Sequence, residues 1–113
     1  MKLKEIIEKL QLKVLTGQNK LGEEVTGGYT SDLLSDVIAN SKQGDLWITL
    51  QIHQNITAVA KLKDLAGIII VNKREPDKDT LQKAEVENIP LLCSDEMAFD
   101  ISGKLYELIG SKE

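Results

Sequence analysis

Two adjacent glycines, Gly27 and Gly28, precede a short polar run and are the first residues whose types and spacing suggest chemistry. Glycine has no Cβ, so its backbone N–H groups can approach a ligand closely, and N–H groups at a helix N-terminus bind anions. The run continues with Tyr29, Thr30 and Ser31, and we expect Thr30 or Ser31 to cap a helix. This segment is therefore a candidate site for a phosphate or carboxylate group. The alternative interpretation, that the glycine pair only makes a tight turn, stays open.

Further candidate ligand-binding residues follow the strands that we expect later in the chain: His53, Asn55, Asn72, Arg74 and Ser94. In open parallel α/β sheets, ligands bind beyond the carboxyl ends of the strands. Arg74 can hold a carboxylate or phosphate through two N–H groups. His53, the only histidine, has either a structural role or a role in ligand binding or pH response. Together with the glycine segment, these residues predict one binding face for a small anionic metabolite or nucleotide.

No set of residues has the spacing that catalysis or metal binding needs. The glycine pair lacks the glycine spacing and the lysine of a phosphate-binding loop. Thr30 and Ser31 have no histidine base nearby in the sequence, which makes them caps rather than nucleophiles. His53 has no cysteine or histidine partner at metal-ligand spacing. We therefore predict no catalytic residue, no metal site and no cofactor, and we do not expect an enzyme.

Composition argues against two classes of partner. The net charge is −4, the basic residues are scattered, and aromatic residues make up 4% of the chain, so nothing resembles a nucleic-acid-binding surface. The longest apolar run, Ala66–Val71, is far shorter than the roughly 20 residues that span a bilayer. The single cysteine, Cys93, cannot form an internal disulfide, which is typical of a reducing compartment. The sequence predicts a cytoplasmic protein without nucleic-acid or membrane partners.

The elements that must position the candidate residues are helices alternating with strands. Apolar residues at helical spacing predict a helix over 3–10, and short strands are expected at 12–15 and 23–26. The next helix is expected to be capped by Thr30 or Ser31. Its apolar face consists of Leu33, Leu34, Val37 and Ile38. Three strand–helix units come next. Their strands are expected at 46–50, 67–71 and 89–93. We expect Asn55 to cap the first of their helices, Pro76–Asp77 to open the second and Ser94 to cap the last, with Leu62 and Met97 among the inward residues.

The run from Ile68 to Val71 decides the predicted sheet type. It is apolar at every position rather than at alternate positions. Such a strand is normally buried on both faces, as in a parallel sheet covered by helices. The sequence therefore predicts one α/β domain over residues 1–113, with a mostly parallel sheet flanked by helices and a β-α-β-α-β-α core after an N-terminal helix and short strands.

Several segments resemble the DRTGG domain family. Residues 24–28, Glu-Val-Thr-Gly-Gly, resemble the signature for which that family is named, and residues 29–37 continue as the family does. Residues 44–49, 51–56 and 65–71 also resemble stand-alone DRTGG proteins, so the resemblance covers nearly the whole chain. The sequence departs from the signature at Glu24 and Val25, which replace Asp and Arg.

The resemblance implies a regulatory role. DRTGG domains accompany HPr kinase/phosphorylase, some phosphotransacetylases and pyrophosphatases that also contain CBS domains, where they lie beside a catalytic domain and often at a dimer interface. By this resemblance we expect a stand-alone regulatory or ligand-sensing domain that forms a homodimer. The alternative is a non-enzymatic interaction module, or adaptor, that acts on a partner enzyme.

Overall fold

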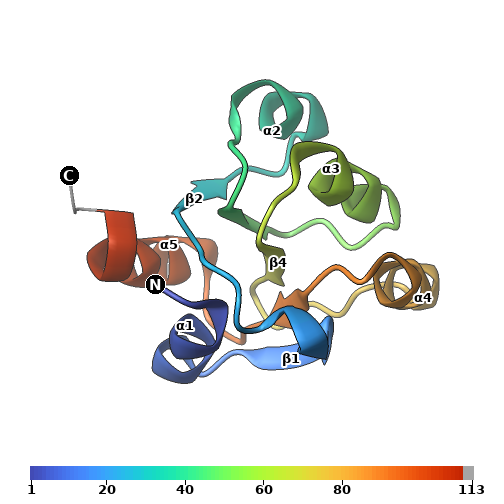
Figure 1. Cartoon of the computed structure of the whole chain (residues 1–113). Helices are drawn as coiled ribbons and strands as arrows, with labels where there is room; N and C mark the ends of the chain where they lie inside the picture. Colours follow the sequence, from blue (N-terminus) through green and yellow to red (C-terminus); the bar gives the residue numbers. More distant parts are fainter. Residues whose placement is uncertain (111–113) are drawn as a thin grey trace.

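A five-stranded sheet forms the centre of the protein, and helices cover both of its faces (Figure 1). The computed structural model describes residues 1–110. The strand order is β1-β5-β4-β3-β2, so β1 and β2 are the two edges. The four strands β2 to β5 are parallel, and β1 is antiparallel to β5. The strands are β1 (Lys13–Thr16), β2 (Gly27–Thr30), β3 (Asp45–Thr49), β4 (Gly67–Ile70) and β5 (Leu91–Cys93). The predicted α/β class with a mostly parallel sheet is confirmed.

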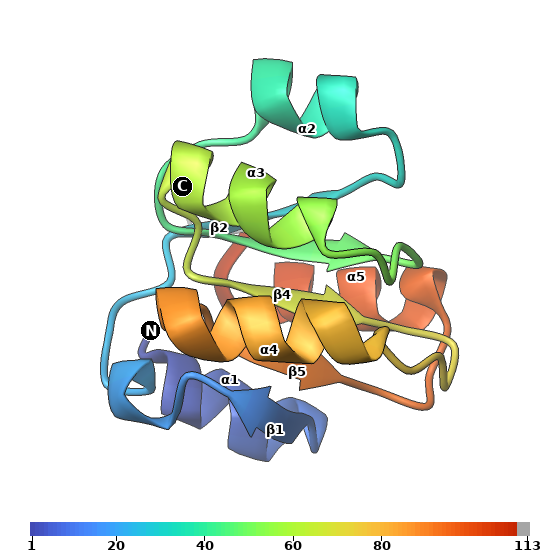
Figure 2. The ribbon, with the colours of Figure 1, turned by 90° about the vertical axis from the view of Figure 1, so that its right-hand side faces the viewer.

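The direction of winding determines where the helices lie. Strands β2 to β5 are neighbours in sequence order, and right-handed crossovers place the three connecting helices on the same face. Figure 2 shows α2, α3 and α4 side by side in front of the sheet, and in Figure 1 α1 and α5 lie on the opposite face. The helices are α1 (Leu3–Leu10), α2 (Leu34–Asn40), α3 (Asn55–Lys63), α4 (Lys78–Glu87) and α5 (Ala98–Leu105), with a 3₁₀ turn η1 (Gln18–Lys20) and a π-helical turn η2 (Tyr106–Gly110).

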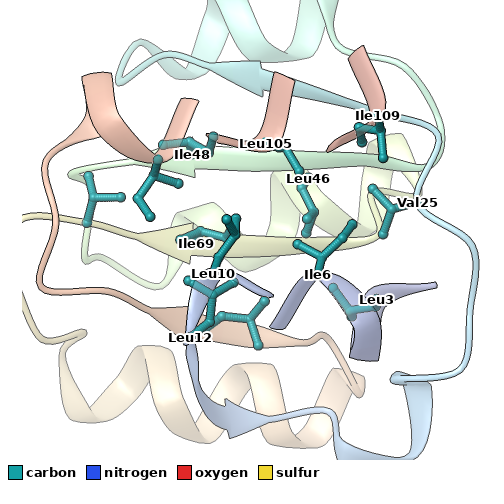
Figure 3. Close-up of a cluster of buried hydrophobic side chains, with 13 residues drawn as sticks. Leu3, Ile6, Leu10, Leu12, Val25, Leu46, Ile48, Ile69, Leu105 and Ile109 are labelled. Carbon is teal, nitrogen blue, oxygen red and sulfur yellow. The ribbon is translucent and has the colours of Figure 1, made fainter. Parts of the chain in front are cut away.

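Alternate residues of the central strands build two separate cores. Leu46 and Ile48 of β3 pack with residues of α1, α5 and η2 (Figure 3). Trp47, between them in the sequence, packs with residues of α2, α3 and α4. Because successive side chains of a strand point to opposite faces, a strand covered on both sides is buried at successive positions rather than at alternate ones. All five residues of β3 and all four of β4 are indeed buried.

The segment around the glycine pair differs from the prediction. Gly27 and Gly28 are the first two residues of β2, not a turn before a helix, and neither has a positive φ. The strand expected over 23–26 is reduced to an isolated bridge between Lys2 and Glu24. Pairing with β3 makes 27–30 a strand, although its residues have little strand preference of their own.

The predicted helix caps are also wrong, because two of these side chains make turns outside the helices. Ser31 Oγ accepts the N–H of Leu33 at 3.1 Å, and α2 begins only at Leu34. Ser94 Oγ accepts the N–H of Glu96 at 3.0 Å, and α5 begins at Ala98. Such serine turns compete with capping for the same hydroxyl. Asn55 is the first residue of α3 rather than its cap.

Two residues predicted to face inward are exposed instead. Leu62 of α3 and Met97, just before α5, are 67% and 55% exposed. Among the four predicted apolar positions on α2, only Val37 is fully buried. Helix α2 lies next to the short edge strand β2, which offers little apolar surface to cover.

Two glycines test the packing of the loops. Gly17 has φ +81°, and an added Cβ would lie 2.5 Å from Pro90 Cα, whereas Gly22 has nothing within 4 Å. We expect Gly17→Ala to lower the free energy of unfolding by about 2–4 kcal/mol, because the backbone strain and the overlap with backbone add. Gly22→Ala is the control and should change it by less than about 0.5 kcal/mol. Urea denaturation measures both, and equal values would contradict this packing.

Candidate functional site

The predicted binding face divides into two separate regions. Gly27 and Gly28 begin β2, at the amino end of the parallel strands. The second group lies at the carboxyl end, after β3, β4 and β5: His53, Asn55, Asn72, Arg74 and Ser94. The prediction that the glycine pair joins them is therefore wrong. Strands β2 to β5 follow one another without a reversal of order, so they lack the switch point at which such loops form a ligand crevice.

At the carboxyl end, a shallow hollow of about 320 Å³ brings together His53 and Arg74 but not the other three residues. Asp32, which the prediction missed as a site residue, also lines it. Asp32 Oδ1 accepts the N–H of Leu50 at 2.7 Å, and Arg74 Nη1 donates to the Leu50 carbonyl at 2.8 Å. The carboxylate and the guanidinium thus hold the peptide groups of Leu50 from both sides. These bonds support a structural role for Asp32 and Arg74. The negative charge of Asp32 also disfavours the binding of an anion in this hollow.

The remaining carboxyl-end residues hold loops together. His53 Nδ1 lies 3.0 Å from Asp77 Oδ2, and both side chains are largely exposed. Asn72 has a left-handed backbone, φ 63°, and donates its N–H to the Glu96 carbonyl at 2.7 Å. Ser94 accepts the N–H of Lys73 through its carbonyl. These bonds join the loop after β4 to the loop after β5.

A larger groove, which we call the β2 groove, follows the edge strand at the glycine pair. Its volume is about 830 Å³. Its apolar lining includes Ile48, Leu105 and Ile109, which are almost fully buried, and Figure 3 shows these side chains on β3, α5 and η2. Its polar part includes the side chains of Thr30, Asn40, Lys42, Asp45 and Ser102, and the Thr30 and Ser102 hydroxyls are hydrogen-bonded at 2.7 Å.

The glycine pair is needed here for space rather than for a turn. A Cβ added to Gly28 would lie 2.7 Å from Leu105 Cδ2, and a Cβ added to Gly27 would lie 2.7 Å from Asp45 Oδ1. Bare backbone therefore lets α5 lie close to β2 and leaves the β2 groove open. The sequence predicted that a ligand could approach the backbone closely at these two glycines. In the structure, the groups that approach it are side chains of the protein itself, Leu105 and Asp45.

Tyr29 borders the β2 groove but directs its hydroxyl toward α2. The phenol donates to the Asp36 carboxylate at 2.8 Å, and its ring packs with the core cluster around Trp47. The hydrogen bond to Asp36 raises the pKa of Tyr29, with smaller contributions from desolvation and from the Asp36 charge. Hydrogen bonds from Asn40, then Ser31 and Tyr29, lower the pKa of Asp36. Tyr29 therefore fixes α2 to the edge strand.

Within residues 1–110, no helix is long and apolar enough to cross a membrane. In the same part of the chain, no group of three or more His, Cys, Asp or Glu side chains is placed to hold a metal ion.

Comparisons with known proteins give a likeness in structure. No family profile matches the sequence, and no curated protein matches it. A crystal structure of the CBS and DRTGG domains of the regulatory region of Clostridium perfringens pyrophosphatase, complexed with the activator diadenosine tetraphosphate, matches with a TM-score of 0.69 and 15% sequence identity. The match covers 92% of this chain and 45% of that one, so this chain spans less than half its length. The fold is similar to that of a CBS and DRTGG domain region, which agrees with the resemblance seen in the sequence.

The Tyr29–Asp36 bond gives a pH prediction. Because the folded-state pKa of Tyr29 is raised, its stabilising contribution is full below the ordinary tyrosine pKa of about 10 and is lost as the pH rises through the folded value. We expect tyrosinate absorbance to show one tyrosine that titrates above that pH and is missing in Tyr29→Phe. Asp36→Asn should lower this pKa toward the ordinary value, and no change would contradict the bond.

Proposed function

We propose that this protein is a non-catalytic regulatory domain that binds a small ligand in the β2 groove. The observation that carries the proposal is the groove itself, about 830 Å³ with an apolar part and a few polar side chains. Ligand sites are typically concave, mostly apolar and about 300–1,000 Å³ in volume. The similar fold in the regulatory region of a pyrophosphatase supports a regulatory role.

The ligand class that we propose is a small anionic metabolite or nucleotide. Lys42 supplies a positive charge at the groove, which the Asp45 and Glu24 carboxylates also line, and Glu24 is paired there with the Met1 amino group. The hydroxyls of Thr30 and Ser102 supply further hydrogen-bonding groups. The C. perfringens regulatory region is complexed with a nucleotide activator, which supports screening nucleotides first. Of the predicted ligand-binding residues, Gly27, Gly28, Tyr29 and Thr30 line this groove.

A thermal-shift screen of nucleotides and phosphorylated metabolites tests the proposal. A ligand at 100 times its dissociation constant should stabilise the protein by about 2.7 kcal/mol. Gly28→Val should abolish the shift, because its side chain would occupy the space between β2 and Leu105. Gly22→Val, which meets no atom within 4 Å of its Cβ, is the control and should keep the shift. A shift that survives Gly28→Val would place the ligand elsewhere.

A second candidate function, protein–protein interaction, is favoured by the outer surface of α5 and the residues next to it. Phe99, the only phenylalanine, is 87% exposed, and Met97 and Tyr106 are 55% and 61% exposed. Exposed apolar groups gathered on one element mark interaction surfaces. We propose this surface for the expected homodimer or, alternatively, for a partner enzyme.

Sedimentation velocity tests the homodimer. If α5 forms the interface, Phe99→Asp should weaken dimerisation at least tenfold, because burying an unpaired charge is costly. Leu62→Asp on α3 is a control with an exposed leucine and should leave the dissociation constant unchanged. A wild-type protein that stays monomeric at high concentration would exclude the homodimer. Binding to a partner enzyme would then be the remaining interaction proposed for this surface.

A further inference from the structure

Asp45 is the one carboxylate that the fold buries, within the described residues. It begins β3, pairs with Gly27 in the sheet, and is only 8% exposed. Its Oδ2 accepts the backbone N–H of Lys42 at 2.8 Å. In the described part of the chain, no hydrogen bond reaches Oδ1 and no cation lies within ion-pair distance of the carboxylate.

A buried carboxylate without a cation is destabilising unless its oxygens find donors. No described side-chain polar atom is both sealed from solvent and without a partner, so Oδ1 keeps at least a small contact with solvent. Asp45 and Gly27 both line the β2 groove, and Oδ1 lies 2.7 Å from where a Cβ of Gly27 would be. The missing side chain of Gly27 therefore leaves Oδ1 accessible from the groove.

We infer that Asp45 is a specificity-determining residue that accepts a hydrogen bond from the amino group of a heterocyclic ring bound in the β2 groove. The inference rests on the proposed function and names the ligand chemistry at this end of the site. A carboxylate accepts hydrogen bonds and does not donate them, so the ligand must supply the N–H. Hydrogen bonds to a charged acceptor are about twice as strong as neutral ones.

The other residues of the groove fit the rest of such a ligand. Ile48, Leu105 and Ile109 line the groove but are almost fully buried, whereas Tyr106, which is 61% exposed, also lines it and offers an aromatic surface to a flat ring. Lys42 lies beside the same groove and can bind an anionic group attached to the ring. A nucleotide with an amino-bearing base combines these three features: an N–H donor, a flat ring and an anion.

Adenosine and purine riboside provide a matched pair of probes, because they differ only in the amino group. In heteronuclear NMR titrations of the whole chain, we expect adenosine to shift the amide signals of Gly27, Gly28 and Leu46 in a saturable way. Purine riboside should bind at least tenfold more weakly, which corresponds to about 1.4 kcal/mol. Equal affinities of the two probes would overturn the inference.

Variants of Asp45 and Gly27 provide a second test of the inference. Asp45→Asn keeps a side-chain oxygen for the Lys42 N–H and should remove the preference for adenosine, as should Gly27→Ala, whose Cβ would cover Oδ1. Asp79→Asn, on the exposed surface of α4, is the control and should retain the preference. If Asp45→Asn binds adenosine as the wild type does, the inference fails, whereas groove binding itself stands.

The two proposals can fail independently. Adenosine that shifts no signal of the β2 groove also overturns the inference about Asp45. The proposed function is then still decided by the metabolite screen and its dependence on Gly28. A screen without any ligand would reject both.

Discussion

The burial of β3 and β4 between two helical layers is the constraint on which the other features depend. All residues of both strands are buried, and apart from Asp45 and Thr49 at the ends of β3 they are apolar or glycine, so each strand needs helices on both sides. Because β2 to β5 are wound in one direction, α2, α3 and α4 all cover one face, and α1 and α5 must cover the other. Removing either layer would expose half of the core.

The edge strand β2 follows from the same arrangement. Helix α5 lies over this edge, and Leu105 is so close to β2 that a side chain at position 28 would overlap it. Gly28 has no side chain and therefore avoids this overlap. The unpaired edge, the end of α5 and the start of β3 then enclose the β2 groove. The groove is thus a product of packing at the edge of the sheet, not of the loops beyond the carboxyl ends.

The polar residues at the carboxyl end have a different role from the one that their types suggested. Asp32 and Arg74 hold the peptide groups of Leu50, and His53 is paired with Asp77. Such bonds reduce the freedom of the loops that join strands to helices. Loops carry function in many α/β proteins, but here their side chains are used mainly to stabilise one another.

The sequence by itself determined the α/β class, the parallel centre of the sheet and most of the helices. Ile68–Val71 is apolar throughout and the helices have 3.6-residue periodicity, and both patterns are local consequences of burial. The tertiary structure alone decided that Gly27 and Gly28 belong to a strand, that they lie apart from His53 and Arg74, and that Asp45 is open to a groove. Two glycines carry no side-chain pattern, so their strand exists only through pairing with β3. The accessibility of Asp45 depends on an atom that Gly27 lacks, a relation between two strands that no local pattern records.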